Sequence, residues 1–206
     1  MAQYFEVHPK DPQPRLIRRS VEIVREGGVI VYPTDSAYAL GCRMDNKHGL
    51  DRIRRIRQLE EAHNFTLICI DLSQISTFAK INNEAFRLIK SLTPGPFTFI
   101  LPATRETPRR LQHSKRKTIG IRLPDNPITA ALVAELQEPL FSSTLIFPGE
   151  AEAAADPEFF RERLEKAVDL IIDGGIVIYE PSTIIGFTED LPEIIRQGKG
   201  IAGPLR

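Results

Sequence analysis

Largely apolar runs of four to six residues recur along this chain, and segments with helical periodicity lie between them. The runs at residues 29–32, 66–70, 97–101 and 118–123 do not alternate strictly between apolar and polar side chains. Strands of that kind are expected where helices cover both faces of a sheet. The sequence therefore predicts an α/β fold, in which a twisted, mixed β-sheet is flanked by helices.

Prolines, glycines and capping residues indicate where the helices should begin and end. Apolar residues recur at helical spacing over residues 16–24, and a Gly-Gly pair stops the pattern soon afterwards. Residues 46–59 and 84–91 predict two further helices. Asp125 or Asn126, just before a proline, is a standard opening for a fourth helix.

Two segments share one local pattern, REGGVIVYPTDS at residues 25–36 and IDGGIVIYEPST at residues 172–183. Each contains a Gly-Gly pair and then predicts an apolar strand that ends in tyrosine, followed by a loop with hydroxyl groups. The sequences that flank the two segments do not match, so we infer no domain repeat. An Asp-Pro pair predicts a helix that starts at Pro157 and reaches Ile171. Residues 150–156 before it read as a surface loop, and residues 191–196 as the last strand.

Composition limits the class of protein. A chain of 206 residues with 42% apolar residues can bury one sizeable core. Basic and acidic residues number 27 each, but 21 basic and 12 acidic residues occur up to Arg122, which predicts a positive face made mainly by the first part of the chain. Only Cys42 and Cys69 occur, and no apolar run approaches the roughly 20 residues that span a bilayer, so we expect a cytoplasmic protein outside the membrane.

Hydroxyl groups follow several of the predicted strands. Thr34 and Ser36 follow the first strand, Thr144 follows the apolar pair at 140–141, and Ser182 with Thr183 ends the second copy of the shared pattern. Ligands of open α/β sheets bind beside strand ends, so convergence of these loops would form a pocket for a small amino acid or a phosphate. Taken singly, each loop fits a turn or a helix cap equally well.

Two basic segments are candidates for phosphate binding. Arg52, Arg54, Arg55 and Arg57 lie on one predicted helix, either as its solvated face or, for the last two, as ligands of phosphate oxygens. Residues 105–117 fit a flap over a triphosphate or a contact with an RNA backbone, and the absence of interleaved aromatic residues argues against base stacking. The four histidines are scattered, which predicts no metal site, and no Walker loop occurs.

Five sequence blocks occur in a fixed order: VYPTDSAYALGC at 31–42, TPGPFTFIL at 93–101, TIGIRLPDNPI at 118–128, PSTII at 181–185 and IIRQG at 194–198. In this order and spacing, the blocks resemble the signature of the YrdC/Sua5/YciO family across nearly the whole chain. NFTLIC at 64–69 and RKTIGIR at 116–122 are most similar to its YciO branch. The resemblance implies a single YrdC-like domain over residues 1–206, with its core at 14–200, whose twisted α/β sheet encloses a concave basic cleft.

The resemblance also implies a reaction. Family members with established activity make threonylcarbamoyl-adenylate from L-threonine, bicarbonate and ATP, and release pyrophosphate. The product serves the N6-threonylcarbamoyl modification of adenosine 37 in tRNA, and the family is also described as binding double-stranded RNA. Mg²⁺ is expected to arrive with the nucleotide rather than in a protein cage.

Particular residues match the family's ligand-binding positions. Those that match threonine-binding positions are Thr34, Arg122, Ser142 and Ser182. Those that match nucleotide-binding positions are Arg55, Arg57, Asn64, Thr118, Thr144 and Arg196. Guanidinium groups there would neutralise a triphosphate, and hydroxyl groups would orient it.

The chain departs from the family pattern at two places. The family's Lys-x-Arg reads Arg55-Ile56-Arg57, and its Ser-x-Asn reads Thr144-Leu145-Ile146, so an apolar side chain replaces an amide. We therefore expect synthase chemistry that is weak, altered or absent.

Two other functions stay open. In one, the altered cleft acts on a related adenylate or acyl phosphate, for example by hydrolysing it. Alternatively, the protein binds double-stranded RNA or tRNA without synthase activity. RNA binding would depend on Arg109, Arg110, Lys115 and Lys117.

Overall fold

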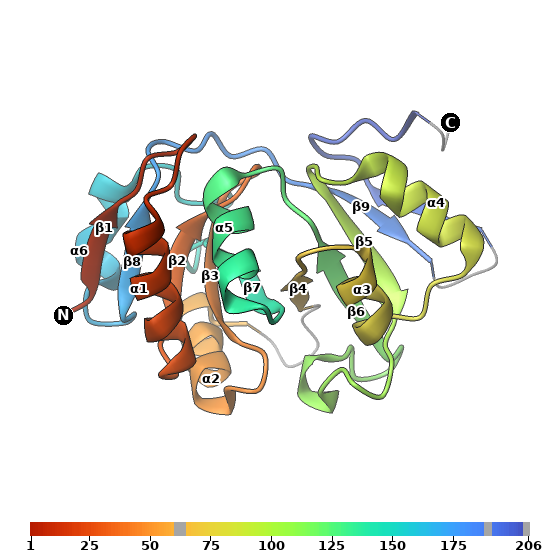
Figure 1. Ribbon diagram of the computed structural model, residues 1–206, viewed down its shortest axis with the longest axis horizontal. Helices are drawn as coiled ribbons and strands as arrows, with labels where there is room; N and C mark the ends of the chain where they lie inside the picture. Colours follow the sequence, from red (N-terminus) through yellow and green to blue (C-terminus); the bar gives the residue numbers. More distant parts are fainter. Residues whose placement is uncertain (60–64, 188–190, 204–206) are drawn as a thin grey trace.

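The computed structural model describes residues 1–59, 65–187 and 191–203, and one ten-stranded sheet runs through them (Figure 1). The strands are β1 (Gln3–Glu6), β2 (Ile30–Pro33), β3 (Tyr38–Arg43), β4 (Thr66–Ile68), β5 (Phe97–Pro102), β6 (Thr118–Arg122), β7 (Leu140–Thr144), β8 (Leu170–Asp173), β9 (Thr183–Gly186) and β10 (Glu193–Arg196). Their order across the sheet is β1-β8-β2-β3-β7-β4-β6-β5-β9-β10, with parallel and antiparallel neighbours. The predicted mixed sheet is therefore confirmed.

Helices cover the sheet, as predicted. They are α1 (Pro14–Arg25), α2 (Lys47–Arg57), α3 (Leu72–Phe78), α4 (Asn83–Leu92), α5 (Pro127–Leu136) and α6 (Pro157–Leu164), with one 3₁₀ turn η1 (Arg109–Leu111). Asn46, Asn82 and Asn126 cap α2, α4 and α5, because each side chain accepts a hydrogen bond from the backbone N–H three residues on. These caps explain why the helix starts were predictable from the sequence.

Both faces of β2 are buried, which accounts for its lack of polar alternation. Ile30 and Tyr32 pack in one hydrophobic cluster with α1 and α5, two helices that lie side by side (Figure 1). Val29 and Val31 belong to a second cluster, which includes side chains of α2 and α6. Each fully buried large apolar side chain contributes about 1.5–3 kcal/mol to folding, so burial on both faces stabilises β2 in its place between β8 and β3.

Residues 157–171 do not form the single helix that the sequence predicted. α6 ends at Leu164, and the run that begins at Leu170 forms β8, which pairs in parallel with both β1 and β2. Ile171 and Ile172 point to opposite hydrophobic clusters. A β-branched run buried on both faces is stable as a strand, and this tertiary context overrides the helical pattern.

The strand predicted in the second copy of the shared pattern is also wrong, because residues 174–182 belong to no strand. Ile176 and Ile178 are 69% and 78% exposed there. β2, which the first copy forms, has a paired strand on each side, whereas residues 174–182 have only single backbone contacts such as Val177 N–H to Ala155 O, 2.9 Å. The predicted last strand is present as β10. No helix among the described residues is long and apolar enough to cross a membrane.

Candidate functional site

The loop between β2 and β3 is a tight turn held by hydroxyl groups. The Thr34 hydroxyl donates to the carbonyl of Ala37 (2.7 Å) and accepts the backbone N–H groups of Ser36 and Ala37, 3.2 Å from each. Thr34 is therefore buried inside its own turn, and it does not line the nearby cavity. Ser36, whose Oγ lies 3.3 Å from that of Thr34, does line it.

A cavity of about 340 Å³ lies along the middle of the sheet and is rich in hydroxyl and guanidinium groups. Its serine and threonine lining consists of Ser36, Thr66, Thr98, Thr118, Ser142, Ser143, Thr144 and Ser182. Its charged lining consists of Arg57, Arg116, Arg122 and Arg196, and no aspartate or glutamate lines it within the described part of the chain. The predicted loops from distant segments thus meet at this one cavity.

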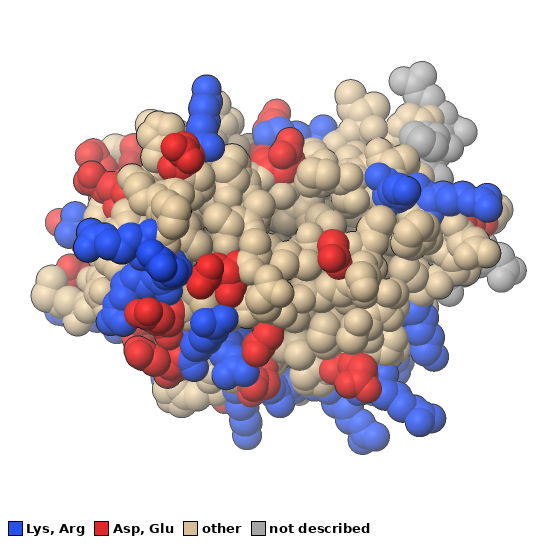
Figure 2. Space-filling model, viewed as in Figure 1, with Lys and Arg blue, Asp and Glu red and all other residues tan. Residues whose placement is uncertain are grey.

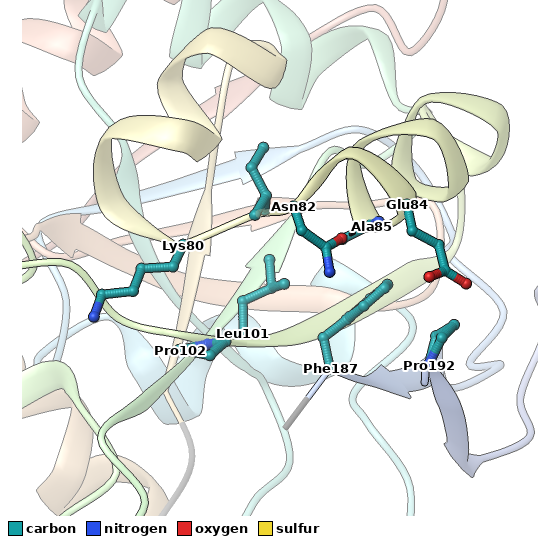
Figure 3. Close-up of a pocket in the computed structure, with 9 residues that line it drawn as sticks. Lys80, Asn82, Glu84, Ala85, Leu101, Pro102, Phe187 and Pro192 are labelled. Carbon is teal, nitrogen blue, oxygen red and sulfur yellow. Dashed lines mark hydrogen bonds between the residues drawn. The ribbon is translucent and has the colours of Figure 1, made fainter. Parts of the chain in front are cut away.

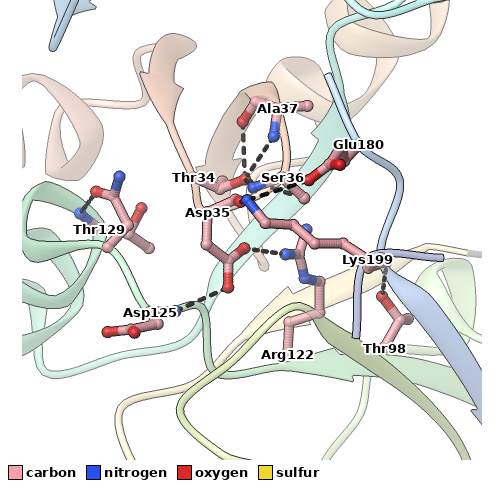
Figure 4. A network of polar contacts seen from close by, with 12 residues as sticks. Thr34, Asp35, Ser36, Ala37, Thr98, Arg122, Asp125, Thr129, Glu180 and Lys199 are labelled. Carbon is pink, nitrogen blue, oxygen red and sulfur yellow. Dashed lines mark hydrogen bonds and ion pairs between the residues drawn. The ribbon is translucent and has the colours of Figure 1, made fainter. Parts of the chain in front are cut away.

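Arg122 is the most deeply buried of these arginines, and Asp35 holds it. The Nη2 atom of Arg122 lies 2.5 Å from Oδ1 of Asp35, and Oδ2 of Asp35 accepts the backbone N–H of Asp125 at 2.9 Å (Figure 4). Burial lowers the pKa of Arg122, and the adjacent Asp35 opposes that shift. Lys199 crosses from the C-terminal segment, and its Nζ donates to the carbonyl of Asp35, 2.8 Å away (Figure 4).

Three buried polar atoms in the cavity wall lack a hydrogen-bond partner among the described residues. They are Nε of Arg57, Nε of Arg122 and Oγ of Ser143. Burial also lowers the pKa of Arg57, whose Nη1 donates to the carbonyl of Ile146, 2.5 Å away. Buried donors are rarely left unsatisfied, so these three atoms are unusual features of the residues that line the cavity.

Other side chains hold the hydroxyl groups in place. The buried Tyr32 donates its hydroxyl to Oγ of Ser142 (2.7 Å), and burial raises the pKa of that tyrosine. The hydroxyls of Thr98 and Ser182, from β5 and the loop before β9, lie 2.7 Å apart. These contacts fix the wall of the cavity from the core side.

Most of the residues matched to the family's ligand-binding positions line this cavity. Those that do are Arg57, Thr118, Arg122, Ser142, Thr144, Ser182 and Arg196. Arg55 is exposed on α2, where its Nε donates to the carbonyl of Asp51, and Asn64 lies outside the described residues. Thr144 and Ser142 lie within β7 rather than beyond a strand end, because β7 stays paired with β3 as far as Thr144.

The remaining arginines of α2 have structural partners. Arg52 pairs with Asp169 at 2.6 Å, and the guanidinium of Arg54 lies over the ring of Phe65, 5.0 Å from its centroid. Of the four arginines in this segment, only Arg57 lines the cavity.

The sequence interpretation did not assign Arg116, Ser143, Thr66 or Tyr179 to the site. Arg116 and Thr118 both line the cavity, but Lys117 between them has a left-handed φ of +56°, so the alternation of side chains along a strand could not have linked them. Ser143 could have been noticed as the middle of a run of three hydroxyl residues. No group of three or more metal-binding side chains occurs in the residues with described positions.

Comparisons with known proteins agree with this geometry. The family model Sua5_yciO_yrdC, described as "Telomere recombination", matches residues 22–198. YciO of Escherichia coli is 55% identical over 99% of both chains, and a threonylcarbamoyl-AMP synthase of Coxiella burnetii is 31% identical over 81% of this chain and 89% of its own.

Solved structures show the same fold. The crystal structure of E. coli YciO matches with a TM-score of 0.96 and 54% identity, and each chain is covered completely. A Sua5 from P. abyssi, crystallised in complex with L-threonine, matches with a TM-score of 0.87 and 26% identity over 95% of this chain and 57% of its own. The resemblance noted from the sequence, including its closeness to the YciO branch, is confirmed, and the chain belongs to the Sua5/YciO/YrdC family.

Proposed function

We propose that this protein binds ATP and L-threonine in the cavity and carries out a weakened or altered form of threonylcarbamoyl-AMP synthesis. In the full reaction, L-threonine, bicarbonate and ATP give threonylcarbamoyl-AMP and pyrophosphate, for the modification of tRNA. The observation that carries the proposal is the convergence of Arg57, Arg122 and Arg196 with eight serine and threonine side chains around one cavity, whose described lining includes no acidic residue. Such a lining suits a ligand rich in phosphate or carboxylate oxygens.

The arrangement suits alignment and charge stabilisation rather than covalent catalysis. Arg57 and Arg196 would neutralise phosphate oxygens, and Arg122, although its Nη2 is held by Asp35, would meet a carboxylate with the part of its guanidinium that lines the cavity. Catalysis would then consist of placing a carbamate oxygen near the α-phosphorus and stabilising the leaving pyrophosphate. We propose that Mg²⁺ enters with the nucleotide, since it keeps several waters and prefers phosphate ligands.

Two features support a weakened reaction. Ile146 lines the cavity at the place of the family's asparagine, and its side chain offers no hydrogen bond. Nη1 of Arg57 is occupied by the Ile146 carbonyl at 2.5 Å, so fewer of its donors face a phosphate. Loss of one donor to a developing negative charge lowers a rate by about 10²-fold or more.

Calorimetric titration with ATP, with and without L-threonine, tests the binding part of the proposal. We expect saturable binding that Arg57→Gln weakens by at least about tenfold, because a hydrogen bond to a charged group contributes about 1.5–3 kcal/mol. Arg55→Gln is the matched control, because this exposed arginine of the same helix does not line the cavity. Flat traces for both ligands, or equal losses in the two variants, would contradict the proposal.

Exchange of labelled pyrophosphate into ATP, dependent on threonine and bicarbonate, tests the chemical part. We expect exchange well below that of a relative with an intact Ser-x-Asn motif, measured side by side. Equal turnover would remove the claim of weakening and leave the binding proposal in place.

The residues of the RNA-binding alternative do not all line one pocket. Arg109 and Lys117 line a separate hollow, whereas the Nη2 atom of Arg110 donates to the carbonyl of Met44, 3.1 Å away, and Lys115 is exposed. RNA binding would leave the hydroxyl wall of the cavity without a role, so we favour the nucleotide. Affinity for duplex RNA that falls steeply with salt and requires all four residues would favour RNA instead.

A further inference from the structure

A second concave site lies beside the cavity, and every charged side chain that lines it is basic. This hollow, of about 770 Å³, has Lys80, Arg105, Arg109 and Lys117 in its lining, with Thr104 and Gln112 among the neutral residues. No acidic side chain lines it, and none of its four cations takes part in an ion pair, within the residues that the structure describes. Lys and Arg side chains project along the lower edge of the face shown in Figure 2.

The backbone beneath these cations is fixed by hydrogen bonds between segments. The N–H of Lys80 donates to the carbonyl of Pro102 (2.8 Å), and the N–H of Ala103 donates to the carbonyl of Lys117 (2.9 Å). Three short segments, after α3, after β5 and before β6, are therefore tied together. The cations extend from a rigid base, so their charges stay concentrated.

Lys117 has an unusual backbone conformation for a lysine. Its φ is +56°, in the left-handed region, which costs free energy for a residue with a side chain. Its neighbours Arg116 and Thr118 line the cavity, whereas Lys117 lines the hollow. Its ammonium group donates to the carbonyl of Ser114, 2.7 Å away, which keeps the charge in the loop beside the hollow. A strained residue at the lining of a concave site is a reason to look for a ligand there.

From these observations we propose that the hollow is a second anion site, separate from the cavity, for a compact anion with several charges, of the oligophosphate class. Charge must carry the recognition of this anion, because the neutral donors already make hydrogen bonds. Nε2 of Gln112 donates to the carbonyl of Thr107 (2.7 Å), and the hydroxyl of Thr104 donates to the carbonyl of Thr77 (2.6 Å). Four unpaired cations around a concave surface favour an anion that enters the hollow over one that meets only its rim.

The lining also excludes other ligand classes. No aromatic side chain lines the hollow in the described part of the chain, so a nucleobase would have nothing to stack on. The neighbouring pocket near the start of α4 is lined by both Lys80 and Glu84, but the ammonium group of Lys80 lies away from Glu84 (Figure 3). The ammonium group of Lys80 is thus free to serve the hollow.

Titration of the full-length protein with inorganic tripolyphosphate tests the proposal. The parent variant carries Arg57→Gln and Arg196→Gln, which disable the cavity, so that remaining binding reports on the hollow. Adding Lys80→Gln and Arg109→Gln should weaken that binding by about tenfold or more, since two of four cations are lost. Adding Lys90→Gln and Lys115→Gln instead is the matched control, because replacing these two exposed lysines removes the same amount of charge outside the hollow.

Equal weakening in both sets of variants would show a general charge effect and overturn the proposal. So would an absence of tripolyphosphate binding together with duplex RNA binding that depends on Lys80 and Arg109. Amide NMR shifts in the unmodified protein give a second measurement that needs no variant. They should move at residues 103–105 and at Lys117 when tripolyphosphate is added, and unchanged signals there would refute the site. ATP binding at the cavity is measured separately, so the two proposals can fail independently.

Discussion

Asp35→Asn is the sharpest test of how the cavity is built, because it removes one partner of a buried ion pair. The Arg122 and Asp35 side chains are 10% and 7% exposed, and their charged atoms lie 2.5 Å apart. Removing one charge of such a pair leaves the other buried and costs about 3–5 kcal/mol. Asparagine keeps the shape and an acceptor for the Asp125 N–H, and the cavity admits some water, so we expect about 3 kcal/mol.

Urea unfolding followed by circular dichroism measures this loss. Domains are stable by about 5–15 kcal/mol, and urea m-values are about 1–3 kcal/mol/M, so the midpoint should fall by roughly 1–3 M. The matched control is Glu138→Gln, which removes the partner of Arg43 in a pair at 3.2 Å with side chains 30% and 45% exposed. That change should cost less than about 1 kcal/mol.

A double variant of the same pair should be more stable than Asp35→Asn alone. Asp35→Asn combined with Arg122→Met removes both charges, and it should recover much of the stability lost in the single variant, because a well-packed apolar chain needs no partner. If Asp35→Asn costs no more than the Glu138→Gln control, Arg122 is solvated by the cavity, and the reasoning about its buried charge is refuted.

Three other predictions follow from burial and close packing. Burial raises the pKa of the Cys42 thiol to about 12, so only about one molecule in 10⁴ carries the thiolate at pH 8, and a thiol reagent should modify it only on unfolding. Gly120→Ala would place its Cβ 2.8 Å from the Phe65 carbonyl, so urea unfolding should show a loss of about 1–3 kcal/mol, whereas Gly203→Ala, with no neighbour within 4 Å among the described residues, should be neutral. Ile146→Asn should raise pyrophosphate exchange by about tenfold or more, since it restores an amide donor to the cavity; unchanged exchange would show that the apolar residue is not the cause of weak activity.

Local signals in the sequence were enough to predict most helix starts, because each depends on a capping residue and a few neighbours. Asn46, Asn82 and Asn126 all make the hydrogen bonds that their positions indicate. The same kind of evidence failed where sheet pairing decides. Residues 170–173 and 176–179 are both short apolar runs, yet only the first lies between two available strand edges.

The cavity itself depends on strand order, which no local pattern specifies. β7 inserts between β3 and β4, and this insertion brings Ser142 opposite Gly41 on one side and Thr66 on the other. β9 lies parallel to β5, so Thr183 pairs with Phe97 and the preceding Ser182 reaches the hydroxyl of Thr98. The family resemblance indicated most of these positions, because related chains share the strand order as well as the motifs. Asp35 shows what that route omits: its role is to hold Arg122, and only the distance between the two charges identifies it.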